Sequence, residues 1–122
     1  MSDELSGLPP QVQERLLRLQ QLQQTLNSIL GQKQQVELEI AEIDQANTEL
    51  QKLGDDATIY KATGSLMIKT EKTKVTTELT ERKDLLNTRV TIVTKQEERL
   101  RSQIKEVQTK LQQDLNPVTP QA

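Results

Sequence analysis

The chain has 122 residues, of which 33% are apolar and only one, Tyr60, is aromatic, so it is too polar to fill a compact globular core. Its net charge is −2, with acidic and basic residues interleaved, which argues against a basic surface that binds nucleic acid. The absence of cysteine and histidine excludes disulfides, thiolate or imidazole metal ligands, and catalysis that depends on either residue.

The composition is typical of long helices and coiled coils. Charged residues make up 28% of the chain, and Gln, Glu, Lys, Leu and Arg are abundant. Disorder is the alternative for so polar a chain, but the regular helical spacing of Leu, Ile and Val argues against it. No apolar run approaches about 20 residues and no signal peptide is evident, so we expect a cytoplasmic protein without a membrane partner.

The first periodic segment begins near Pro9-Pro10, because proline suits the first turn of a helix. No proline interrupts residues 11–53, and Gly54 offers a stop, so the sequence predicts a helix over 9–54. Lys33 and Asn47 are polar positions within its apolar seam. Mostly alternating steps of three and four join the apolar positions of that seam, which are Val12, Leu16, Leu19, Leu22, Leu26, Ile29, Val36, Ile40, Ile43 and Leu50.

Between this helix and the next, two β-prone runs flank a glycine and predict a β-hairpin over 57–70. With Thr63-Gly64 as the two loop residues, Ile59 would oppose Ile68, and Lys61 would oppose Leu66. Tyr60 and Met67 would then meet on the other face. A lone hairpin with apolar groups on both faces is marginal in water, so it predicts an oligomerisation element.

The second periodic segment predicts a helix over 71–116, which ends where Pro117 bars continuation. The β-branched run at 88–94 could be read as a strand, but helical periodicity on both sides favours a helix. The apolar positions of this segment are Val75, Leu79, Leu86, Val90, Val93, Leu100, Ile104, Val107, Leu111 and Leu115.

Two segments of nearly equal length joined by a hairpin predict a mainly α fold in a single domain spanning 1–122. We expect a long antiparallel two-helix coiled coil with a central β-hairpin, and residues 1–8 and 117–122 as flexible ends. Neighbouring charges such as Glu97, Glu98 and Arg99 point to different sides of a helix, so they predict a solvated surface and no catalytic cluster. We therefore expect no enzyme activity, no metal and no cofactor.

In this arrangement the chain resembles the prefoldin family, specifically its archaeal β-type subunits, which have one hairpin. The resemblance covers about residues 8–115. The segments that carry it are Leu8-Pro9-Pro10-Gln11-Val12-Gln13, Leu19-Gln20-Gln21-Leu22-Gln23-Gln24, the hairpin run 60–69, and Lys95-Gln96-Glu97-Glu98-Arg99-Leu100.

The resemblance implies a heterohexamer of two α-type and four β-type subunits whose hairpins join in an oligomeric β-barrel. It further implies a chaperone that binds unfolded polypeptides without ATP and transfers them to a group II chaperonin. The absence of a Gly-rich phosphate-binding loop agrees with that activity. The hairpin residues expected in oligomerisation are Ile59, Tyr60, Leu66, Met67 and Ile68.

Antiparallel helices bring the two ends of the chain together, so apolar residues near both termini are candidates for binding unfolded clients. Packing within the coiled coil is the alternative role, and it is favoured for Leu16, Leu19 and Leu111, which continue the seam. The full candidate set is Leu5, Leu8, Val12, Leu16, Leu19, Leu111, Leu115 and Val118. A structural scaffold or tether without clients is the alternative function.

Overall fold

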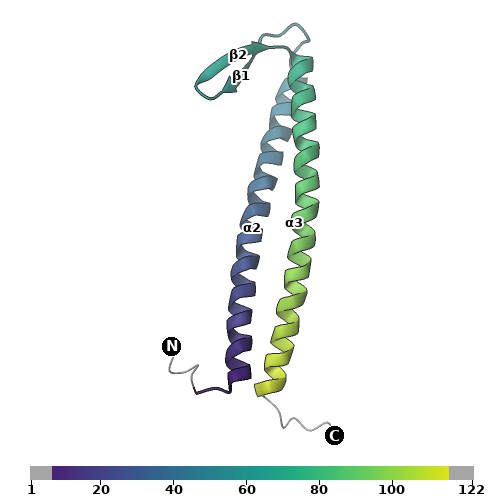
Figure 1. The fold of residues 1–122 in the computed structure, drawn as a ribbon. Helices are drawn as coiled ribbons and strands as arrows, with labels where there is room; N and C mark the ends of the chain where they lie inside the picture. The colour runs from purple at the N-terminus through teal and green to yellow at the C-terminus, as the bar shows by residue number, and fades with distance from the viewer. Residues whose placement is uncertain (1–6, 116–122) are drawn as a thin grey trace. The chain divides into compact units, whose positions relative to one another are not determined.

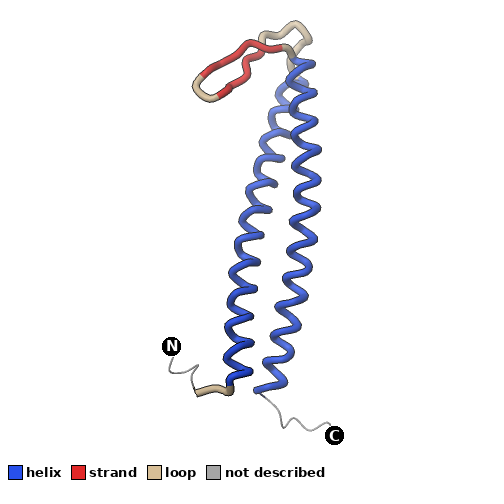
Figure 2. Tube along the Cα trace, viewed as in Figure 1, coloured by secondary structure: helices blue, strands red, loops and turns tan. Residues whose placement is uncertain are grey.

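The computed structural model describes residues 7–115, which form two helices with a two-stranded sheet between them in the sequence (Figure 1). Helix α2 spans Pro10–Gln51, strand β1 spans Ile59–Thr63, strand β2 spans Leu66–Thr70, and helix α3 spans Lys72–Leu115. Figure 2 shows that strand structure is confined to the short segment between the helices. The mainly α fold with a central hairpin is confirmed.

The chain divides into two compact units, each built from both helices. The terminal unit consists of residues up to Gln32 and residues from Val93 onward, and the hairpin unit consists of Lys33–Ile92.

In the terminal unit, the first turn of α2 is organised by the two consecutive prolines. The carbonyl of Pro9 accepts hydrogen bonds from the amides of Val12 and Gln13, both at 3.0 Å, and Pro10 occupies the first helical position. The Gln13 side chain also donates to the Leu8 carbonyl at 2.7 Å. Proline costs nothing here because the first amides of a helix lack partners within it.

The core of the terminal unit is a cluster of seam residues from both helices. Its buried members are Leu22, Leu26, Leu100 and Ile104, and the half-buried residues packed against them are Leu19, Ile29, Leu30 and Val107. Arg15, near the start of α2, forms an ion pair with Asp114, near the end of α3. The helices of this unit therefore run antiparallel.

The hairpin unit has an equivalent core. Its buried members are Val36, Ile43 and Leu86, with Ile40, Leu79 and Val90 packed against them. Ion pairs cross between the helices beside this core, from Arg82 to Glu39 at 2.8 Å and from Lys83 to Asp44 at 2.6 Å. Most residues of the predicted seam are buried or half-buried in the two units, which confirms the coiled-coil pattern.

The β-branched run at 88–94 lies within α3, as the surrounding periodicity predicted. Thr88 and Thr91 donate hydrogen bonds from their hydroxyls to the carbonyls of Asp84 and Asn87, each at 3.1 Å. These bonds satisfy the hydroxyls within the helix, so the threonines do not favour a strand here.

Helix α2 ends at Gln51, and Gly54 lies beyond it in the connection to β1. The amides of Lys52 and Leu53 bond to the carbonyls three residues earlier, in a tighter turn that closes the helix. The Lys72 amine donates to the Leu53 carbonyl at 2.8 Å, so a side chain from the start of α3 binds the connection that follows α2.

The predicted pairing of the hairpin is wrong by one residue in each strand. Ile59 pairs with Thr70, Lys61 with Ile68, and Thr63 with Leu66, which makes Gly64-Ser65 the two-residue turn. Only Gly64 has a positive φ, at 60°, among the described residues. A turn with glycine at its first central position and no positive φ at the second is of type II′. The expected pairing would have placed Gly64 at the second central position of the turn.

The corrected pairing keeps the predicted division of side chains between the two faces. Tyr60 and Met67 still share one face, because the shift preserves the alternation along each strand. The opposite face carries Ile59, Lys61, Leu66 and Ile68, so apolar residues occur on both faces.

Candidate functional sites

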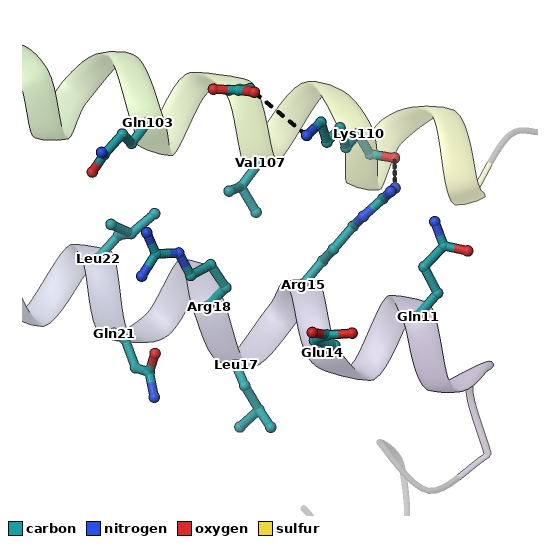
Figure 3. A pocket seen from close by; sticks show the side chains of 11 residues that line it. Gln11, Glu14, Arg15, Leu17, Arg18, Gln21, Leu22, Gln103, Val107 and Lys110 are labelled. Carbon is teal, nitrogen blue, oxygen red and sulfur yellow. Dashed lines mark hydrogen bonds and ion pairs between the residues drawn. The ribbon is translucent and has the colours of Figure 1, made fainter.

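The terminal unit contains an open hollow of about 910 Å³ beside the two helices (Figure 3). Leu22 and Val107 point toward the opposite helix, whereas Leu17 points away from it. The polar and charged residues that line the hollow are Gln11, Glu14, Arg15, Arg18, Gln21, Gln103, Glu106 and Lys110. The site thus combines aliphatic side chains with charged and amide groups.

Two of the three cations in this hollow have partners. Arg15 donates to the Lys110 carbonyl at 3.1 Å and forms an ion pair with Asp114, while the Lys110 amine lies 3.4 Å from a carboxylate oxygen of Glu106 (Figure 3). Arg18 has no ion pair with any residue that the structure describes. The Arg15–Asp114 contact also joins the early turns of α2 to the last turn of α3.

The structure places the predicted client-binding residues in different environments. Val12 and Leu111 are buried, with 3% and 7% of their surface exposed, and Leu8, Leu16 and Leu19 are half-buried. Leu115 is 58% exposed at the last position of α3. Leu5 and Val118 lie outside the described residues. Within the described set, Leu115 therefore offers the largest part of its side chain to a partner.

Leu17 is a candidate that the sequence did not single out. It is 53% exposed and lines the hollow. Its signal was the consecutive pair Leu16-Leu17, because neighbouring residues on a helix differ in direction and both cannot lie in the same seam.

The hairpin unit contains a second candidate surface, on the sheet itself. Four of the five residues predicted to mediate oligomerisation are exposed, namely Tyr60, Leu66, Met67 and Ile68, at 57%, 64%, 67% and 49%. The fifth, Ile59, is buried at 9%. The sheet has two strands in the described part of the chain, so each strand has one edge without a pairing partner.

The sheet is linked to α3 by an ion pair. The Lys61 amine donates to a carboxylate oxygen of Glu78 at 2.9 Å, and both side chains are partly exposed. That hydrogen bond is the main reason why the pKa of Glu78 is lowered below its ordinary value of 4.5, with the charges of Lys61 and Lys74 acting in the same direction and desolvation opposing them. The contact positions β1 beside the early turns of α3.

No group of three or more His, Cys, Asp or Glu side chains within residues 7–115 is arranged to hold a metal ion. Neither α2 nor α3 contains an apolar stretch of the length and hydropathy needed to cross a membrane.

Comparison with known proteins shows similarity over nearly the whole chain. The family model described as "Prefoldin subunit" matches residues 13–117. The prefoldin subunit beta of Methanothrix thermoacetophila is 46% identical over 117 residues, which cover 95% of this chain and 98% of that protein. The equivalent protein of Archaeoglobus fulgidus is 44% identical over 113 residues, covering 93% and 97% of the two chains.

A solved structure is similar as well. The crystal structure of the prefoldin beta subunit from Thermococcus strain KS-1 matches with a TM-score of 0.82 and 38% sequence identity. The match covers 92% of this chain and 96% of that chain. The similarity therefore includes both helices and the hairpin.

Proposed function

This chain belongs to the prefoldin family, and from that premise we propose that it is the β-type subunit of an ATP-independent chaperone that holds unfolded polypeptides. Family membership supports a chaperone-type role and names no catalytic activity. The proposed partners are an α-type prefoldin subunit, in a cytoplasmic heterohexamer of two α-type and four β-type chains, unfolded clients, and a group II chaperonin that receives them.

The observation that carries the client-binding part of the proposal is the exposure of leucines in the terminal unit. Leu17 and Leu115 are each more than half exposed, and Leu17 borders the hollow that also contains Leu22 and Val107. Unfolded chains expose apolar side chains. The free energy falls when these side chains leave water and contact such leucines. Val12 and Leu111 are buried and instead stabilise the ends of the two helices.

Each such contact is weak alone. Full burial of a leucine side chain contributes about 1.5–3 kcal/mol before the cost of ordering the client. Several subunits in one assembly would bind different parts of the same client, and the joint affinity would then exceed that of each subunit. Client binding by the exposed leucines would therefore depend on assembly of several subunits through the hairpin.

The test is suppression of aggregation by the assembled chaperone in the absence of ATP. A chemically denatured client is diluted into buffer containing the full-length chain with a matching α-type subunit, and light scattering is followed. We expect suppression by the full-length chain and a loss of suppression when the chain is cut to residues 20–110. This cut keeps the core cluster of Leu22, Leu26, Leu100 and Ile104.

Point variants separate client binding from folding. The double variant Leu17→Ser, Leu115→Ser should weaken suppression several-fold while far-UV circular dichroism stays unchanged, because both side chains are exposed. Leu85→Ser is the matched control, since Leu85 is 60% exposed but lies in the hairpin unit. Absence of suppression by the full-length assembly would instead favour a structural scaffold or tether without clients.

A further inference from the structure

The backbone groups at the two free edges of the hairpin can be assigned from its pairing. In an antiparallel sheet, hydrogen-bonded and non-hydrogen-bonded pairs alternate, and the pair that closes a two-residue turn is hydrogen-bonded. Thr63 and Leu66 form that closing pair. The residues whose backbone groups point outward to the free edges are therefore Tyr60 and Ala62 on β1, and Met67 and Lys69 on β2.

The edge of β1 carries no unpaired charge. The outward-directed residues Tyr60 and Ala62 are uncharged, and Lys61 lies on the opposite face, where Glu78 neutralises it at 2.9 Å. A strand added along β1 would thus meet an apolar surface.

The edge of β2 is different, because Lys69 is exposed beside Met67 on the same face. The Lys69 side chain has no ion pair or hydrogen bond with any described residue. Asp55, Asp56 and Glu71 line a shallow hollow with Lys69 at the base of the hairpin, but none of them forms an ion pair with it. A strand added along β2 would therefore meet an unpaired cation.

The hairpin of a second copy cannot neutralise this cation. Residues 57–70 include Lys61 and Lys69 and contain no Asp or Glu. If two β2 edges paired antiparallel around Ile68, both Lys69 side chains would lie on one face as diagonal neighbours. Like charges at such positions destabilise strand pairing, whereas opposite charges stabilise it.

We infer that the free edge of β2 binds a strand of a different chain that carries Asp or Glu beside Lys69 and an apolar residue beside Met67. The charge match favours that strand over a second copy of this chain. The inference rests on the proposed role of the hairpin in assembly, and it adds which edge selects the partner and by what chemistry. The edge of β1 has no such charge preference.

A charge-reversed copy of the full-length chain, Lys69→Glu, provides the acidic strand for a test. Wild type, the variant and a 1:1 mixture with one chain isotope-labelled are compared by native mass spectrometry at low ionic strength. We expect the ratio of mixed to like-chain dimers to exceed its statistical value of one by about two- to five-fold, which is the range expected for one opposite-charge pair between strands. The excess should disappear at about 0.5 M salt, where exposed charges are screened.

Lys95→Glu is the matched control, because Lys95 is an exposed lysine of α3 in the terminal unit. Its mixture with wild type should give the statistical proportion of mixed oligomers. A statistical proportion with Lys69→Glu at low salt, or no mixed oligomer at all, would overturn the inference. The aggregation assay with the α-type subunit reads the proposed chaperone function separately, so failure of the inference is distinguishable from failure of that function.

Discussion

At the scale of single residues, Leu85 and Leu86 are neighbours in α3 with opposite surroundings. Leu86 is 2% exposed and contacts the core of the hairpin unit, whereas Leu85 is 60% exposed. Both are leucines in a helix, so helix propensity and chain entropy are the same for the two positions. The difference between equivalent substitutions at these positions therefore measures the contribution of packing.

Leu86→Ala should lower the free energy of unfolding by about 2–5 kcal/mol, because it removes buried methyl groups and leaves a cavity. Leu85→Ala should change it by no more than about 0.5 kcal/mol, as is usual at exposed positions. Urea denaturation followed by circular dichroism measures both values. Equal losses at the two positions would mean that the described core is not the one present in solution.

Glu78 gives a pH dependence whose sign follows from its lowered pKa. The contact with Lys61 requires the ionised carboxylate, so its stabilising effect is fully present above the ordinary pKa of 4.5. The effect is lost as the pH falls through the lowered pKa of the folded chain. Acidification should thus remove the ion pair between Lys61 of β1 and Glu78 of α3 in a range below pH 4.5.

An NMR titration of the Glu78 carboxyl group measures this shift directly. In the variant Lys61→Met, we expect the pKa of Glu78 to rise toward its ordinary value, because the hydrogen bond that lowers it is absent. Arg82→Met is the control, since Arg82 pairs with Glu39 and should leave the titration of Glu78 unaltered. An unchanged pKa in Lys61→Met would contradict the ion pair.

At the scale of secondary-structure elements, two glycines differ in whether the backbone conformation tolerates a side chain. Gly64 lies in the hairpin turn at a φ of 60°, where a side chain is strained regardless of the space around it. Gly31 lies within α2, and an added Cβ would meet no atom within 4 Å. Glycine is therefore required in the turn and unfavourable in the helix.

Gly64→Ala should destabilise the hairpin by about 1–2 kcal/mol, the usual cost of a left-handed conformation for residues with a side chain. The measurement is faster amide hydrogen exchange in residues 59–70. Slower exchange in the Gly64 variant would contradict the type II′ turn.

Gly31→Ala should instead raise the free energy of unfolding by about 0.5–1 kcal/mol, as measured by urea denaturation.

The elements were predictable from the sequence to different degrees. Steps of three and four between apolar residues predicted both helices and the seam, since burial along one helix face depends only on that spacing. The expected hairpin pairing was wrong although the sequence carried a signal for the observed one, because Gly64 followed by Ser65 favours a type II′ turn and Thr63 in a primed turn would need a positive φ that β-branched residues avoid. The structure resolves this through the φ of Gly64 and the pairing of Thr63 with Leu66.

At the scale of the whole molecule, the family was recognisable from the order of helix, hairpin and helix, and the comparisons confirm it. The burial of the candidate binding residues was less predictable. Val12 and Leu111 are buried as seam positions, whereas Leu115 belongs to the same pattern and is 58% exposed at the last residue of α3. The exposure of Leu17 follows from its place next to Leu16, because consecutive residues of a helix cannot both lie in one seam.

The scarcity of aromatic residues, which limits the core, also determines the optical properties of the chain. Tyr60 is the only aromatic residue of the chain, and it lies on the exposed hairpin with 57% of its surface accessible. Near-ultraviolet absorption and intrinsic fluorescence of this chain therefore arise from one position on the sheet. A strand that covers this face would change the emission of Tyr60, so the unlabelled chain carries its own optical reporter of hairpin assembly.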